Sequence, residues 1–168
     1  MNSIARKTAL AGMLAALALI FSYVEVLIPF QPGLPGVKLG LANLVIVMAL
    51  YRLNARYALL INFIRVLMAG LLFTGVFGFF YSLAGCLLSF AVMVLLRRSG
   101  RFSVIGVSMA GGVAHNIGQL MIAIATVSNL RLAAYYPVLL FSGLATGILI
   151  GLVSELVLRH LPAEGARI

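Results

Sequence analysis

The residues of this chain that could do chemistry are few, and most of them stand within apolar segments. The set comprises Glu25, Lys38, Asn43, Asn62, Arg65, Tyr81, Ser82, His115, Asn116 and Gln119. Inside a bilayer such side chains are costly, and they usually face the interior of a helix bundle or a water-filled cavity. Most of this set falls in the outer half or near the midplane of the expected helices. We therefore expect a solute-binding pocket that opens to the outside.

The same composition gives little support for catalysis or for a bound metal. The acids are Glu25, Glu155 and Glu164, and no Asp occurs, so paired carboxylates and aspartate-held Mg²⁺ have almost nothing to use. Cys86 is the only cysteine, and no second His or Cys stands at ligand spacing from His115 on its helix. There is no GxxxxGK[ST] loop to bind ATP. We expect no enzyme activity, no metal site and no cofactor.

Arg65 has two interpretations. It lies about 14 Å from Arg56 along a helix, near the middle of its segment. An unpaired arginine at that depth costs at least about 2.5–3.5 kcal/mol. Its partner is either an anionic ligand held by the guanidinium group or Glu155, about 8 Å nearer the cytoplasmic side. Glu155 also has Arg159 four residues further on, so both interpretations stay open.

The elements that position these residues are apolar helices. Of the 168 residues, 64% are hydrophobic and 9% charged, whereas a soluble domain has about 45–50% and about 25%. A crossing needs about 20 residues, so six crossings leave no room for a soluble domain. We expect an all-α integral membrane protein, a single six-helix transmembrane domain over residues 1–168. The apolar segments are 8–29, 39–52, 57–74, 78–96, 104–127 and 135–158.

Basic residues mark one side of this arrangement. If the segments cross alternately, one side holds Arg6, Lys7, Arg52, Arg56, Arg97, Arg98, Arg101, Arg159 and Arg167. The opposite side holds Lys38 and Arg131. The positive-inside rule then places both termini in the cytoplasm and the protein in the cytoplasmic membrane. Because the basic residues punctuate apolar runs, we expect no nucleic-acid partner. The first apolar run is interpreted as a membrane helix and not as a cleaved signal peptide.

The segment between the first two apolar runs breaks the helical pattern. Residues 29–38 hold Pro29, Pro32 and Pro35, which cannot continue a helix. From Lys38 to Arg52 a helix would span only about 21 Å, against a hydrocarbon core of about 30 Å. Two interpretations follow: a loop that dips into the membrane and lids a pocket, or a kinked surface loop.

Small residues recur at the spacing that lets membrane helices approach closely. Gly143, Gly147 and Gly151 form such a stripe on the sixth segment, and Ala11 and Ala15 form one on the first. We expect the glycine stripe to pack within the bundle. The alanine pair could dock another membrane subunit.

Three motifs carry a family resemblance. PGVKLGLAN at residues 35–43, YSLAG at 81–85 and GVAHNIGQL at 112–120 resemble the signature of the Gx transporter family, also labelled heptaprenyl diphosphate synthase component I. The resemblance extends from about Ala9 to Leu158. That family is similar to the S components of energy-coupling-factor transporters, which use six helices, an outer loop as a gate, and small residues on the first helix to dock a coupling subunit.

The resemblance implies a substrate-binding subunit that captures a small vitamin- or cofactor-like solute, with transport driven by separate coupling and ATPase subunits. Some members are associated with flavin-dependent redox systems, so a flavin is the first candidate. An anionic group would suit Arg65 and Lys38. The second label implies an accessory membrane subunit of a prenyl diphosphate synthase, because a chain without Asp cannot supply aspartate-rich Mg²⁺ motifs. A third alternative is a stand-alone secondary transporter.

Overall fold

The computed structural model describes residues 3–28 and 40–160 of the chain. Within these ranges the fold is entirely helical and contains no strand, which confirms the predicted all-α class. The predicted loop and Lys38 lie outside the described residues. The elements are α1 (Ser3–Leu27), α2 (Leu41–Arg52), α3 (Ala55–Ala69), the π-helical η1 (Gly70–Thr74), α4 (Gly75–Ser99), α5 (Val104–Val127), the 3₁₀ segment η2 (Leu130–Tyr135) and α6 (Tyr136–His160).

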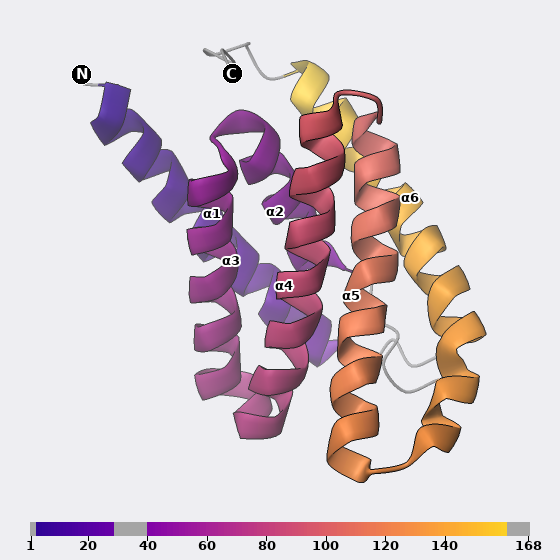
Figure 1. Ribbon diagram of the computed structural model, residues 1–168. Helices are drawn as coiled ribbons and strands as arrows, with labels where there is room; N and C mark the ends of the chain where they lie inside the picture. The colour runs from indigo at the N-terminus through magenta and orange to yellow at the C-terminus, as the bar shows by residue number, and fades with distance from the viewer. Residues whose placement is uncertain (1–2, 29–39, 161–168) are drawn as a thin grey trace.

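The helices run up and down through one bundle (Figure 1). The start of α1, the α2–α3 and α4–α5 connections and the end of α6 lie at the same end of the bundle. The turns between α3 and α4 and between α5 and α6 lie at the opposite end. Short connections of this kind make consecutive helices antiparallel neighbours.

Helix length does not confirm the predicted count of six crossings. Four helical stretches are long and apolar enough to cross a membrane, namely Ile4–Leu27, Ala55–Ser99, Val104–Val127 and Leu130–His160. The second stretch is folded back on itself as the α3–α4 hairpin (Figure 1), so its 45 residues are not one straight span. Helix α2 is apolar but has only 12 residues, or about 18 Å of length.

Helix α2 is short because it is enclosed by the rest of the bundle. Val45, Ile46, Val47 and Leu50 are all 0% exposed, and they point in several directions around the helix. A helix that is apolar on every side is one that is buried on every side. The neighbours of α2 are α1, α3 and α6, so its ends do not have to reach both membrane surfaces.

Glycine residues set the spacing of the last three helices. A Cβ atom at Gly147 would lie 2.6 Å from the Met109 Cα of α5, and one at Gly151 would lie 2.7 Å from the Ile105 Cα. Glycine therefore permits α5 and α6 to touch along their backbones, as small-residue stripes do in membranes. The prediction that the stripe packs within the bundle is confirmed.

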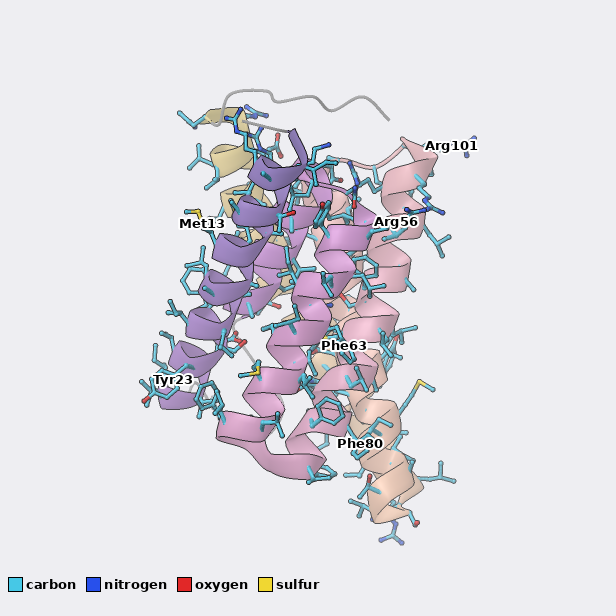
Figure 2. All side chains as sticks on the ribbon, turned by 90° about the vertical axis from the view of Figure 1, so that its left-hand side faces the viewer. Met13, Tyr23, Arg56, Phe63, Phe80 and Arg101 are labelled. Carbon is cyan, nitrogen blue, oxygen red and sulfur yellow. The ribbon has the colours of Figure 1, made fainter. Side chains whose placement is uncertain are left out.

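Basic side chains mark one end of the bundle. In Figure 2, Arg56 and Arg101 lie at this end, whereas Tyr23 and Phe80 lie toward the other. At the basic end the Arg97 guanidinium carbon lies 5.0 Å from the centre of the Tyr51 ring, a distance typical of a cation–π contact. This contact joins the ends of α4 and α2. The predicted charge asymmetry is thus present along the described helices.

Asn54 starts α3, and its replacement gives a first prediction. Its side-chain oxygen accepts a hydrogen bond from the Tyr57 backbone N–H at 3.0 Å, which satisfies an amide that the helix itself leaves unpaired. We expect Asn54→Ala to lower the free energy of unfolding by about 1 kcal/mol. Denaturant titration of the detergent-solubilised protein, followed by circular dichroism, measures this change. Asn54→Asp keeps the acceptor and serves as the control; an equal loss in both variants would contradict the capping role.

Candidate functional site

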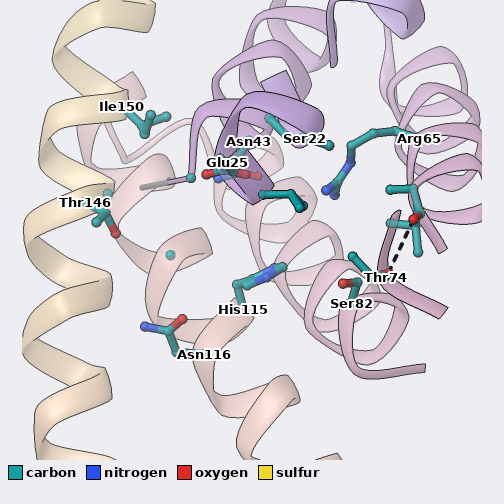
Figure 3. A pocket seen from close by; sticks show the side chains of 17 residues that line it. Ser22, Glu25, Asn43, Arg65, Thr74, Ser82, His115, Asn116, Thr146 and Ile150 are labelled. Carbon is teal, nitrogen blue, oxygen red and sulfur yellow. Dashed lines mark hydrogen bonds between the residues drawn. The ribbon is translucent and has the colours of Figure 1, made fainter. Parts of the chain in front are cut away.

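A cavity lined by both polar and apolar side chains lies between the first three helices and the last three (Figure 3). It contains about 900 Å³ of empty space when its open part is included. Six of the predicted residues line it: Glu25, Asn43, Arg65, Ser82, His115 and Asn116. They come from α1, α2, α3, α4 and α5, so residues that are far apart in the sequence share one site. This convergence is what the sequence predicts for a pocket.

Arg65 extends from α3 into the cavity (Figure 3). Its Nη2 atom donates to the Asn62 Oδ1 at 2.7 Å and contacts the Cys86 Sγ at 2.7 Å. Its Nε atom is buried and has no hydrogen-bond partner. Glu155 instead pairs with Arg159. Within the described residues no carboxylate compensates the charge of Arg65, so the Glu155 alternative is not what the structure shows.

Glu25 joins α1 to the beginning of α2. Its Oε1 atom accepts a hydrogen bond from the Leu41 backbone N–H at 2.9 Å. Leu41 is the first residue of α2 and follows Gly40, whose φ of 77° is left-handed. A carboxylate at a helix N-terminus is stabilised by the unpaired amides and by the helix dipole. Glu25 thus has a structural role at one of its oxygens.

This cap gives a second prediction. We expect Glu25→Ala to lower the free energy of unfolding by about 1–3 kcal/mol, because the Leu41 N–H would lose its only acceptor. Glu25→Gln keeps an amide oxygen at the same place and should retain most of the stability. Thermal unfolding of the purified variants, measured by circular dichroism, tests the difference. Equal stability of the alanine variant and the wild type would show that the hydrogen bond is not maintained in the membrane protein.

Helix α5 forms the wall on which His115 and Asn116 lie. The Asn116 Nδ2 atom donates to the Leu139 carbonyl at 2.7 Å and to the Ser142 Oγ at 3.2 Å, which ties α5 to α6. A Cβ at Gly85 would lie 3.0 Å from the His115 Cε1 atom, so glycine on α4 makes room for the imidazole. Asn116 is therefore held in place, and its side-chain oxygen remains available at the cavity.

Three predicted residues do not line the cavity. Asn62 is buried beside it and holds Arg65, while Tyr81 stacks with Phe77 at a ring-centre distance of 5.9 Å. Gln119 is 1% exposed, and its Nε2 atom has no partner. Gln119 lies one turn from His115 on the side of α5 that faces Gly85 of α4, and none of the three predicted residues reaches the cavity wall. A fourth predicted residue, Lys38, lies outside the described residues.

Three hydroxyl groups of the lining, those of Ser22, Thr74 and Thr146, were not predicted from the sequence. Each donates to a carbonyl of its own helical segment, at 2.9 Å for Ser22, 3.3 Å for Thr74 and 2.9 Å for Thr146. Serine and threonine can satisfy themselves this way anywhere in a membrane helix. Their presence in an apolar segment therefore carries no signal of a site.

Several polar groups of the cavity make no hydrogen bond within the part of the chain that the structure describes. They are the side chains of Asn43 and Ser82, the Nε and Nη1 atoms of Arg65, and the second carboxylate oxygen of Glu25. Such groups are unfavourable in an apolar environment unless water or a ligand satisfies them. The arrangement can bind a small polar molecule by hydrogen bonds and by one cationic group.

The structure also places the residues that bear on metal binding and on the predicted docking pair. Over residues 3–28 and 40–160, no group of three His, Cys, Asp or Glu side chains could hold a metal ion. Ala11 is buried in the core and Ala15 packs against it, so this pair makes contacts within the chain. Docking of a coupling subunit at the pair stays a prediction.

A comparison with family models agrees with one of the two family labels that the sequence motifs suggest. The family model described as heptaprenyl diphosphate synthase component I matches residues 14–157. This range includes the cavity-lining residues on every helix. No curated protein and no solved structure shows a significant match.

Proposed function

The chain belongs to the heptaprenyl diphosphate synthase component I family, and within that family we propose that it is a membrane-embedded solute-binding subunit. It captures a small vitamin- or cofactor-like solute from the outer face, and separate coupling and ATPase subunits drive transport. In this proposal the bundle provides six membrane crossings, with α2 enclosed by the others. The basic end and both termini face the cytoplasm, in accord with the positive-inside rule.

The observation that carries the proposal is the uncompensated charge of Arg65 at the cavity. An arginine at this depth is unfavourable by at least about 2.5–3.5 kcal/mol when unpaired. Among the described residues Arg65 contacts an amide and a thiol, and it forms no ion pair with a carboxylate. An anionic group on a bound solute would compensate the charge. A flavin phosphate is one solute of this kind and remains the first candidate.

Native mass spectrometry of the protein purified in mild detergent tests the proposal. We expect a small molecule to co-purify and to be released on unfolding. His115→Ala and Asn43→Ala should reduce the bound fraction about tenfold, because each removes a hydrogen-bonding group from the cavity. Ser99→Ala, at the exposed end of α4, is the control and should retain the molecule. Wild-type protein that carries no small molecule, in spectra that retain bound lipid, would contradict capture.

A second candidate function follows from the family description. The chain would be an accessory membrane subunit of a prenyl diphosphate synthase, since without Asp it lacks the usual Mg²⁺-binding side chains for diphosphate. In that case deletion of the chain would lower prenyl diphosphate synthesis in membranes, and no solute would co-purify. Uptake of a solute by proteoliposomes that contain this chain alone would instead favour a stand-alone secondary transporter.

A further inference from the structure

The cavity holds two opposite charges that do not pair with each other. Arg65 enters from α3, and Glu25 enters from α1 (Figure 3). No ion pair joins them in the described part of the chain, where the pair formed by Glu155 and Arg159 lies elsewhere on α6. A charge withdrawn from water is costly unless a partner of opposite charge and further hydrogen bonds compensate it.

Arg65 is held so that only part of its guanidinium group is engaged. Both of its contacts with the described residues use Nη2, one to the Asn62 side chain and one to the Cys86 sulfur. The Nε atom is buried without a partner, and Nη1 makes no hydrogen bond to the described residues. A guanidinium group has five N–H donors and cannot lose its charge. Its remaining donors therefore call for an acceptor that carries negative charge.

Glu25 likewise uses only one of its two carboxylate oxygens. Oε1 caps α2 at the Leu41 N–H, while the second oxygen has no partner among the described residues. An ionised carboxylate only accepts hydrogen bonds, so this oxygen calls for a donor. Apart from His115, the other polar side chains of the lining are neutral hydroxyls and amides. These groups cannot compensate the positive charge of Arg65 or the negative charge of Glu25.

We propose that the captured solute carries an anionic group at one end and an N–H donor at the other. The anionic group binds Arg65, and the N–H donor binds the free oxygen of Glu25. This inference rests on the proposed solute capture and narrows the class of solute. An anion without a donor would leave Glu25 unsatisfied and would be repelled by it. A neutral donor would leave the charge of Arg65 uncompensated.

The test uses a defined mixture of small molecules and affinity-selection mass spectrometry on the full chain in nanodiscs. Riboflavin 5′-phosphate and biotin carry both groups. Riboflavin and biotinamide carry N–H donors without the anionic group. Lipoate and 3-methylriboflavin 5′-phosphate carry the anionic group without the N–H donor. The three flavins thus form a matched series that differs in one chemical group at a time. Biotin and biotinamide differ only in the anionic group, while lipoate shares the pentanoate chain of biotin but has a different ring and serves as a second anion without an N–H donor.

Four variants assign each end of the solute to its residue. Arg65→Gln removes the cation, and Glu25→Gln removes the anion while an amide oxygen still caps Leu41. Arg131→Gln and Glu155→Gln make the same chemical changes at positions outside the cavity lining. Circular dichroism and a monodisperse elution profile establish that each variant is folded before it is compared.

We expect the wild type to retain a molecule that carries both groups. The retained amount should be at least about tenfold greater than that of the related molecules that lack one group. Arg65→Gln should abolish the preference over the partner without an anion. Glu25→Gln should abolish the preference over the partner without an N–H donor, and the two outside variants should keep both preferences. Retention of single-group molecules equal to that of their matched partners would overturn this inference and leave capture standing. Retention of no molecule by the wild type would overturn the inference together with the proposed capture.

Discussion

Gly112→Leu should nearly abolish the yield of folded protein. A Cβ atom at this position of α5 would lie 2.4 Å from the Gly143 carbonyl oxygen and 3.5 Å from the Gly147 Cα atom of α6. Overpacking in a core typically costs about 1–3 kcal/mol when side chains can adjust. Here the obstacle is backbone, so α5 and α6 would have to separate along their length, and we expect a larger loss.

The yield of monodisperse protein after detergent extraction measures this effect. Gly12→Leu is the matched control, because a Cβ at Gly12 of α1 meets no atom within 4 Å and the residue is exposed. The control should match the wild type. Equal yields of the Gly112 and Gly12 variants would show that α5 and α6 are not packed backbone to backbone.

Arg65→Met should abolish solute capture without a loss of stability. In the solute-free protein, with which the variant is compared, the substitution removes an uncompensated charge that costs at least about 2.5–3.5 kcal/mol in a membrane helix. It also leaves the Asn62 oxygen without its donor, at a cost of about 1–3 kcal/mol. The two effects nearly cancel or favour the variant, so the unfolding midpoint should stay or rise. The bound fraction of the co-purified molecule should fall at least about tenfold.

This combination distinguishes a binding residue from a structural one. Thermal unfolding and native mass spectrometry are carried out on the same preparation, with Arg131→Met as the control outside the cavity. The control should leave both measurements unchanged. A variant that unfolds more easily while it still retains the small molecule would assign Arg65 to the structure and not to the site.

The helices could largely be predicted from hydropathy, because the backbone N–H and C=O groups of an apolar membrane segment must form hydrogen bonds within regular structure. The segment predicted at 39–52 is α2 (Leu41–Arg52), and that predicted at 104–127 is α5 (Val104–Val127). The π-helical turn at Gly70–Thr74 could not be predicted. Residues 70–73 are as apolar as the helix before them, and the irregular hydrogen bonds depend on how α3 and α4 pack.

The candidate site could be predicted in part, since Arg65, His115 and Asn116 are conspicuous among apolar neighbours. Gln119 is equally conspicuous, yet it is buried away from the cavity. His115 and Gln119 both lie against Gly85 of α4, so their different places follow from how far the cavity extends along α5 and not from the face of the helix that they occupy. Such contacts join residues far apart in the sequence, so one helix taken alone does not reveal them.

An experimental density map of the protein, purified from its own membranes in lipid nanodiscs, tests the central claim most directly. The account predicts non-protein density in the cavity between α1–α3 and α4–α6, in contact with the free edge of Arg65 and near His115 and Asn116. A cavity filled by the protein's own side chains, or an Arg65 paired with a carboxylate of this chain, would contradict it.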